Sequence, residues 1–161
     1  MILSTHAIVG GAIASLFPTH PAVAIVGGFA SHFLIDAIPH WDYPLQSISL
    51  GPGARNRLTL RGPRLRDLAV IAFDAFAGLI AAIALFSTPV SMLTILSGAL
   101  AAMLPDPLQF AYTLRPGEPL KSLQRFHSWM HTKHQIGARI GVSSQIAFVA
   151  GVIGLKALLS M

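Results

Sequence analysis

The sequence contains no cysteine among its 161 residues. This absence excludes disulfide bonds, thiolate metal sites, iron–sulfur clusters and cysteine nucleophiles. Charged residues are also scarce, at 11 % of the chain against about 25 % in a typical soluble domain. Hydrophobic residues make up 53 %, and the mean hydropathy is +0.66. The composition excludes a disordered chain, a nucleic-acid-binding basic protein and an ordinary water-soluble enzyme, and it indicates an integral membrane protein.

The apolar residues gather in five segments, which cover residues 1–17, 21–38, 68–86, 89–104 and 140–159. Each segment approaches the ~20 residues that a helix needs to cross the hydrocarbon core of a bilayer. The first segment lacks the basic flank of a cleavable signal and contains a histidine, so we expect it to belong to the mature protein. The sequence therefore predicts a single transmembrane domain over residues 1–161, all-α, with about five transmembrane helices.

The basic residues are distributed unevenly along the chain. Eleven Lys and Arg against six Asp and Glu give a formal net charge of +5. All of the basic residues except Lys156 fall in two connections, one after the second apolar segment and one after the fourth. Five spans place both connections on one side of the membrane, which the positive-inside rule identifies as cytoplasmic. We expect a bacterial or archaeal cytoplasmic (inner) membrane protein whose N-terminus also faces the cytoplasm.

The first four segments contain a candidate internal repeat. Shifting the chain by 68 residues places Gly10 on Gly78, Ala14 on Ala82 and Pro21 on Pro89. A duplication would make residues 1–42 and 68–108 two similar helical hairpins, related by an axis along the membrane normal. Because the identities are few and mostly small residues, a chance match stays the alternative. We expect an interfacial amphipathic helix over about 118–135 and a last helix over about 139–160.

Ionisable residues inside the apolar segments are few, and they are histidines and aspartates. His6, His32, Asp36 and Asp74 lie at positions that the predicted topology places in the cytoplasmic half of the membrane. A charged group at this depth is costly and marks a functional site. His32, Asp36 and His40 are each four residues apart, so a continuous helix would place them on one face. Pro39, directly before His40, would bend the helix between Asp36 and His40.

A second set of histidines precedes the last apolar segment. His127, His131 and His134 have the spacing i, i+4, i+7, which puts them on one face of a helix. Asp42 and Asp106 follow the second and fourth segments at the same side of the membrane. Imidazole and carboxylate groups without a thiolate suit Zn, Mn, Fe, Co or Ni. We expect a divalent transition metal, zinc first among these.

Nine candidate donors share the predicted cytoplasmic half: His6, His32, Asp36, His40, Asp42, Asp74, Asp106, His127 and His131. One tetrahedral zinc uses three or four ligands, so the surplus indicates either two ions or one ion with an acid/base pair. The metal ligands that we expect are His6, His32, Asp36, His40, Asp106 and His127.

The remaining donors suit proton transfer. We expect Asp42 or Asp74 as a general base and His131 or His134 as a general acid. Two simpler interpretations stay open. Asp74 would pair with an arginine or a histidine between helices, and His134 would be an exposed residue beside Lys133.

Residues 31–42, with His6 upstream and Leu-Pro-Asp at residues 104–106, resemble the membrane-bound metal-dependent hydrolases of the YdjM-like type. These small membrane proteins carry an early histidine, a His/Asp-bearing helix that ends in Pro-x-x-Asp, and a later histidine motif. The resemblance implies a metal site made of the matching residues: His6, His32, Asp36, His40, Asp42, Asp106, His127 and His131. The later motif reads His-Ser-Trp-Met-His, where the family pattern has a His followed by a Thr-His-Ser-like element.

These features predict a metal-dependent hydrolase that cleaves a phosphoester of a lipid, such as an anionic phospholipid, or of another amphiphile. A site that lies between helices at membrane depth suits a lipid substrate. Arg61 and Arg64 would bind the anionic head group of this lipid. The simpler alternative is that these arginines only determine the membrane topology. The main alternative is a divalent-metal transporter or metal sensor that uses the same donors. A haem protein, with His32 or His40 opposite His127, is a third. We expect no nucleic-acid partner.

Overall fold

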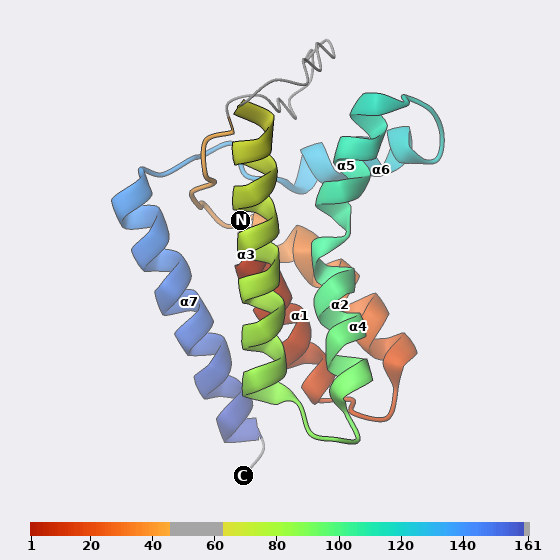
Figure 1. Ribbon diagram of the computed structural model, residues 1–161, viewed down its shortest axis with the longest axis vertical. Helices are drawn as coiled ribbons and strands as arrows, with labels where there is room; N and C mark the ends of the chain where they lie inside the picture. The colour runs from red at the N-terminus through yellow and green to blue at the C-terminus, as the bar shows by residue number, and fades with distance from the viewer. Residues whose placement is uncertain (46–62, 160–161) are drawn as a thin grey trace.

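The computed structural model describes residues 1–45 and 63–159 (Figure 1). Within them the chain forms helices and no strand, which confirms the predicted all-α class. The helices are α1 (Leu3–Ser15), α2 (Pro21–Asp36), α3 (Pro63–Phe86), α4 (Met92–Met103), α5 (Pro105–Leu114), α6 (Leu120–Met130) and α7 (Ala138–Leu159).

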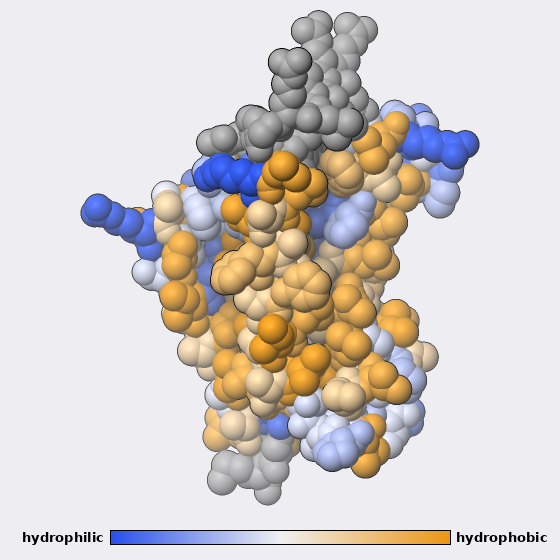
Figure 2. Space-filling model, viewed as in Figure 1, coloured by the Kyte–Doolittle hydropathy of each residue, from blue (hydrophilic) through white to orange (hydrophobic). Residues whose placement is uncertain are grey.

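Two of the described helices, α3 and α7, are long and apolar enough to cross a membrane. The mean hydropathy of their most apolar windows is 2.4 and 1.7, yet only 11 % and 6 % of those windows are buried inside the protein. A core helix of a soluble protein would be mostly buried, so these exposed apolar surfaces favour a membrane environment. Figure 2 shows the consequence: apolar residues cover the middle of the visible face, and hydrophilic side chains project near its upper end.

Two shorter apolar helices, α2 and α4, pack with α3 around a third, α1. Helix α1 contacts α2, α3, α4 and α7, and α4 also packs on α2 and α3. Gly98 of α4 lies at the closest approach, because a Cβ built there would stand 2.7 Å from the Cβ of Ala14 and 2.8 Å from the carbonyl oxygen of Gly10. Gly28 of α2 also faces the backbone of Gly98. Small residues thus let α1, α2 and α4 approach at backbone distance.

Helix α7 is fastened to this bundle through a buried amide. The Oε1 atom of Gln145 accepts hydrogen bonds from the backbone N–H of Ile2 and the hydroxyl of Thr5, each at 3.2 Å. Its Nε2 atom donates to the carbonyl oxygen of Trp41 at 2.7 Å. Gly141, one turn earlier, leaves room for the backbone and Cβ of Trp41. Helix α7 therefore holds both the start of α1 and the segment that follows α2.

Prolines shape the helices at the end of the bundle that carries the site. Helix α2 ends at Asp36, since the residue before Pro39 disfavours the helical conformation. The predicted helix over residues 89–104 begins only at Met92, and a further helix, α5, starts at Pro105 without having been predicted. Pro105 lacks an N–H and so separates α4 from α5. The predicted interfacial helix ends at Met130, before His131 turns to an extended conformation.

The connections between α1 and α2 and between α3 and α4 lie at one end of the bundle, and α5 and α6 lie at the other (Figure 1). The internal duplication stays a prediction. Arg61 lies outside the described residues, as do Arg55 and Arg57. Arg64 lies in the first turn of α3, and its side chain is likewise outside the described part of the structure.

Candidate metal centre

The carboxylate of Asp36, the last residue of α2, is the centre of the site. It is 1 % exposed, and histidines from three helices surround it. His32, one turn earlier on α2, places Nε2 3.2 Å from Asp36 Oδ2, and His127 of α6 places Nε2 3.3 Å from the same oxygen. His6 of α1 has its Nε2 3.2 Å from Asp36 Oδ1. Helices that are distant in sequence thus bring three imidazoles to one buried carboxylate.

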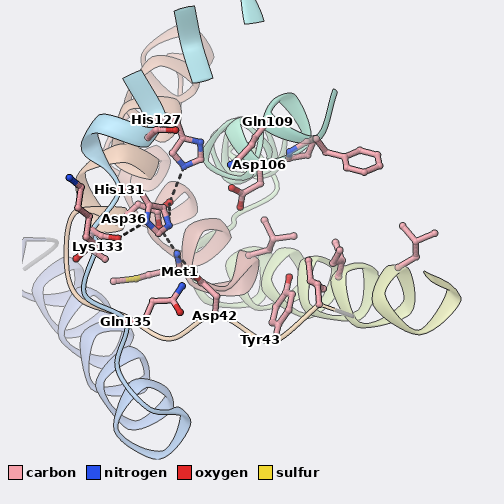
Figure 3. Close-up of a pocket in the computed structure, with 18 residues that line it drawn as sticks. Met1, Asp36, Asp42, Tyr43, Asp106, Gln109, His127, His131, Lys133 and Gln135 are labelled. Atoms are coloured by element: carbon pink, nitrogen blue, oxygen red, sulfur yellow. Dashed lines mark hydrogen bonds and ion pairs between the residues drawn. The ribbon is translucent and has the colours of Figure 1, made fainter. Parts of the chain in front are cut away.

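Further donors lie around this centre (Figure 3). The Nε2 atoms of His40 and His131 are each 3.9 Å from an oxygen of Asp36. Asp106, in the first turn of α5, has Oδ1 3.6 Å from His32 Nε2, and Asp42 has Oδ2 3.1 Å from His40 Nε2. These side chains come from α5 and from the segments that follow α2 and α6.

The amino group of Met1 also enters this region. It contacts Asp36 Oδ1, and it lies 2.8 Å from His40 Nε2 and 3.3 Å from Asp42 Oδ1. It therefore occupies space between the donors of α2 and those of the segment that follows.

Hydrogen bonds to backbone carbonyls orient three of the imidazoles. The Nδ1 atom of His32 lies 2.8 Å from the carbonyl oxygen of Ala102, and the Nδ1 of His131 lies 2.9 Å from that of Thr132. His40 makes the same contact with its near neighbour Ile38, at 2.7 Å. A carbonyl oxygen only accepts, so each Nδ1 carries a proton and donates it. A neutral ring then presents its Nε2 lone pair to the centre, as a metal-ligating histidine does.

The imidazoles at the centre crowd around one carboxylate oxygen. The Nε2 atoms of His32 and His127 lie 3.3 Å apart, and both also contact Asp36 Oδ2, at 3.2 and 3.3 Å. Both ring nitrogens of His6 are buried without an aligned hydrogen bond, and its ring stacks on that of His32 with the centroids 4.0 Å apart. Buried polar atoms without a partner are costly. A cation among these nitrogens would remove that cost, so the donor set fits a metal ion.

The donors form two groups within the described part of the chain. The inner group consists of His32, Asp36, Asp106 and His127, and its ligand atoms lie within 4.8 Å of one another. The outer group consists of Asp36, His40 and His131, within the same limit. Asp36 belongs to both groups. The buried inner group could hold a metal ion, with donors that suit a first-row transition metal.

Members of both groups line part of a cavity of about 560 Å³, namely Asp36, Asp106, His127 and His131 (Figure 3). Apolar side chains from α1, α3, α5 and the segment after α2 form much of its wall: Leu3, Leu45, Leu68, Ile71 and Phe110. Its polar lining includes acidic, imidazole and other hydrogen-bonding groups: Asp36, Asp42, Tyr43, Asp106, Gln109, His127, His131 and Lys133. The cavity is therefore apolar along its walls and polar at the donor groups.

Two residues after α2 have perturbed titration. Burial raises the pKa of Asp42, but the contact with the His40 imidazole and the positive charge of the Met1 amino group outweigh this effect and lower the pKa to about 2. Asp42 is therefore ionised at neutral pH. Burial also raises the pKa of Tyr43, and the neighbouring carboxylates of Asp74, Asp106 and Asp42 raise it further. Its phenol stays protonated at neutral pH and remains a hydrogen-bond donor to the cavity.

The structure brings together most of the residues singled out from the sequence: His6, His32, Asp36, His40, Asp42, Asp106, His127 and His131. Two others are placed elsewhere. Asp74 of α3 accepts a hydrogen bond from the backbone N–H of Ser4 at 3.3 Å and joins neither donor group. His134 is exposed and does not line the cavity, which agrees with the simpler interpretation of that residue.

Sequence reasoning did not single out Gln145, Tyr43 or Lys133. Gln145 is the only amide in the last apolar segment, and this isolated polar residue was the available signal. Tyr43 directly follows Asp42, and Lys133 was counted only as a topological charge. None of the three fits a metal-ligand pattern, so spacing alone gave no reason to place them at the site.

Comparisons with models of protein families, with curated proteins and with solved structures found no match for this chain. The fold and the site define an all-α protein that has two candidate membrane-spanning helices and a buried His/Asp centre. Any function must therefore be argued from the centre and the cavity themselves.

Proposed function

We propose that this protein is a membrane-bound, metal-dependent hydrolase that cleaves a phosphoester of a lipid or another amphiphile at the cytoplasmic leaflet. One observation carries the proposal: metal-competent donors line a cavity whose walls are largely apolar. The proposal agrees with the resemblance to the YdjM-like hydrolases, which rests on the residues of the donor groups.

The orientation of the histidines supports a metal rather than simple polar packing. His32 donates from Nδ1 to a backbone carbonyl and presents Nε2 to the centre, within reach of Asp36 and the opposing His127. A hydrogen bond donated from the other ring nitrogen in this way fixes the ring and increases the basicity of a ligand. We propose zinc as the first candidate and Mn, Fe, Co and Ni as the others. A bound ion would act as a Lewis acid and would make bound water more acidic.

The cavity supports an amphiphilic substrate. Leu68 and Ile71 of α3 and Phe110 of α5 offer apolar contacts to a hydrocarbon chain, while the donor groups would receive a polar head group. Lys133 also lines the cavity and would attract an anionic head group. A small hydrophilic substrate would have no use for these apolar walls.

The chain supplies residues for proton transfer at the same place. Asp42 is ionised and lines the cavity, which suits a general base. His131 also lines the cavity, whereas His134 does not. Of the two histidines considered as proton donors, His131 alone is positioned to assist a leaving group, either directly or as a ligand of a second ion.

Metal content and hydrolysis together test the proposal. The detergent-purified chain, reconstituted with each candidate metal, should bind a divalent ion and release the phosphorylated head group or the phosphate from phospholipid in mixed micelles. Asp36→Asn should lose both properties, while His20→Ala, an exposed residue at the opposite end of the bundle, should keep both. Absence of bound metal after every reconstitution would overturn the proposal.

The transporter alternative makes a different prediction. A transporter would move the metal into proteoliposomes only along a gradient and would hydrolyse nothing in detergent. Gradient-driven uptake without hydrolysis would therefore replace the proposed function with this alternative.

A further inference from the structure

We propose that the outer group, Asp36, His40 and His131, binds a second divalent transition-metal ion, and that Asp36 bridges this ion to one in the inner group. Asp36 belongs to both groups, so its two oxygens can serve two ions. Imidazole and carboxylate donors define the chemical class of the ion as first-row and divalent. The second site itself does not depend on the proposed function.

The distances around Asp36 agree with a bridge. His32 and His127 are within 3.3 Å of Oδ2, while His40 and His131 approach the two oxygens at 3.9 Å. Zn–N and Zn–O bonds are about 2.0–2.2 Å long, so two donors of one tetrahedral ion lie roughly 3.3–3.5 Å apart. The outer donors are slightly wider than this and need only small side-chain adjustments to enclose an ion.

A fourth donor is available to the outer ion. Asp42 Oδ2 is 3.1 Å from His40 Nε2, so the Asp42 carboxylate would complete a four-coordinate site. The amino group of Met1 now lies among these same atoms, and a metal ion in the outer group would take its place.

Backbone pairing holds the outer ligands in register. The N–H of Thr132 donates to the carbonyl oxygen of Asp36 at 2.8 Å, and the N–H of Ile136 donates to that of His40 at 3.2 Å. The segment after α6 therefore runs beside the segment after α2, with His40 and Gln135 forming a parallel bridge. His131 directly precedes this paired segment, and its Nε2 lies 3.9 Å from Asp36 Oδ2.

The two sites differ in access. His32 and His127 are buried, but the side chain of His131 is 30 % exposed and that of Asp42 is 35 % exposed. Both exposed residues line the cavity. Asp106 of the inner group also lines the cavity, so both ions would be reached from it. Because both inner histidines are buried and one outer histidine is partly exposed, we expect the outer ion to exchange faster and bind more weakly.

A second ion changes the role of His131. In two-metal sites the ions stand about 3.5–4 Å apart and stabilise both the attacking and the leaving oxygen of a displacement. If the proposed function holds, His131 and Asp42 act as metal ligands, and not as the proton donor and the general base. This step alone rests on the proposed function.

Metal stoichiometry in the full-length, detergent-purified chain tests the inference. Saturation with Mn²⁺ should give two ions per chain in the wild type, one in His131→Ala, two in His20→Ala and none in Asp36→Asn. The electron paramagnetic resonance spectrum should show spin-coupled Mn²⁺ in the wild type and an isolated ion in His131→Ala. Thermal unfolding of each variant checks that the fold persists, and His131→Gln serves as a second variant if His131→Ala does not fold.

One ion per chain in the saturated wild type would overturn the inference, as would two ions in the folded His131 variants. These outcomes separate the two proposals. Two coupled ions without hydrolysis would retain the second site and reject the hydrolase. If the wild type hydrolyses the lipid with a single ion, and His131→Ala still binds that ion, the hydrolase is retained and the second site is rejected. His131 would then keep its role as a proton donor.

Discussion

Asp36 is a buried carboxylate that is surrounded by imidazole side chains. An unpaired charge in an apolar interior is strongly destabilising, so a buried carboxylate requires partners of opposite charge or a metal. Here five histidines place Nε2 within 3.9 Å of its oxygens. The positively charged amino group of Met1 also contacts Asp36, and a bound metal ion would add further compensating charge.

Removal of the metal should therefore destabilise the fold. A ligand that binds only the folded state adds about 2.7 kcal/mol at a free concentration of 100 times its Kd. We expect a chelator to lower the melting temperature of the wild type in detergent and added metal to restore it. The melting temperature of Asp36→Asn should not respond to either addition. An equal response in the variant would show that the stabilising ion binds elsewhere.

Gln145 illustrates a residue whose importance only the tertiary structure reveals. Gln145→Leu removes three hydrogen bonds and leaves the Trp41 carbonyl without this donor, which should cost about 1–3 kcal/mol. Metal affinity should fall as well, because Trp41 is flanked by His40 and Asp42. Thermal unfolding and metal titration measure the two effects.

Ser143→Ala is the matched control for this variant. Ser143 is exposed on the same helix, and its hydroxyl bonds only within α7, to the carbonyl oxygen of Arg139. The control should match the wild type in both measurements. A Gln145→Leu variant with unchanged metal affinity would show that α7 does not position the segment after α2.

At the scale of the elements, the break between α4 and α5 places Asp106 at the centre. Pro105 interrupts the helical hydrogen bonding, and α5 then starts with Asp106 in its first turn. Pro105→Ala would allow a straighter helix and move this carboxylate away from His32. We expect the inner ion to bind more than tenfold more weakly while the helical content stays the same.

Pro107→Ala is the control for the helix break. Pro107 is exposed and lies two residues further along α5, where loss of the ring does not remove the break. Metal titration and circular dichroism distinguish the variants. Equal affinities in the two would show that the break does not set the position of Asp106.

The close approach of α1, α2 and α4 gives a second prediction for the elements. Gly98→Val would force side-chain atoms into the backbone of α1, and overpacking of this kind costs about 1–3 kcal/mol. Gly151→Val on α7 is the matched control, because a Cβ at that position meets nothing within 4 Å. The melting temperature in detergent should drop for Gly98→Val only. Similar losses in both would indicate a general cost of valine for glycine.

The uninterrupted apolar segments predicted the positions of the apolar helices well, but they predicted the helix ends less well. His40 was expected on the face of His32 and Asp36, whereas α2 ends at Asp36 and His40 returns to the centre through the segment behind Pro39. His131 likewise lies beyond the end of α6. Its position depends on the hydrogen bond between Thr132 and Asp36, which joins residues too far apart in sequence for local spacing to reveal.

At the scale of the whole molecule, polarity is segregated between the two ends. Helices α5 and α6, which supply Asp106 and His127 to the inner group, lie toward one end, and the α1–α2 and α3–α4 connections lie at the other (Figure 1). Between them, α3 and α7 expose large apolar side chains such as Phe73, which is 78 % exposed, and Ile146, which is 65 % exposed. Water is a poor environment for this belt, whereas a bilayer would solvate it and leave the two ends in opposite aqueous phases.

The absence of cysteine makes the predicted orientation directly measurable. Thr19→Cys, in the α1–α2 connection, and Ser122→Cys, on the exposed face of α6, each introduce one thiol at opposite ends of the bundle. Because the basic connections should face the cytoplasm, a membrane-impermeant maleimide added to intact cells stripped of any outer membrane should label Thr19→Cys and spare Ser122→Cys. Disrupting the membrane should expose both thiols. Labelling of Ser122→Cys alone in intact cells would invert the topology and place the metal centre on the external side, where a cytoplasmic-leaflet lipid could not reach it.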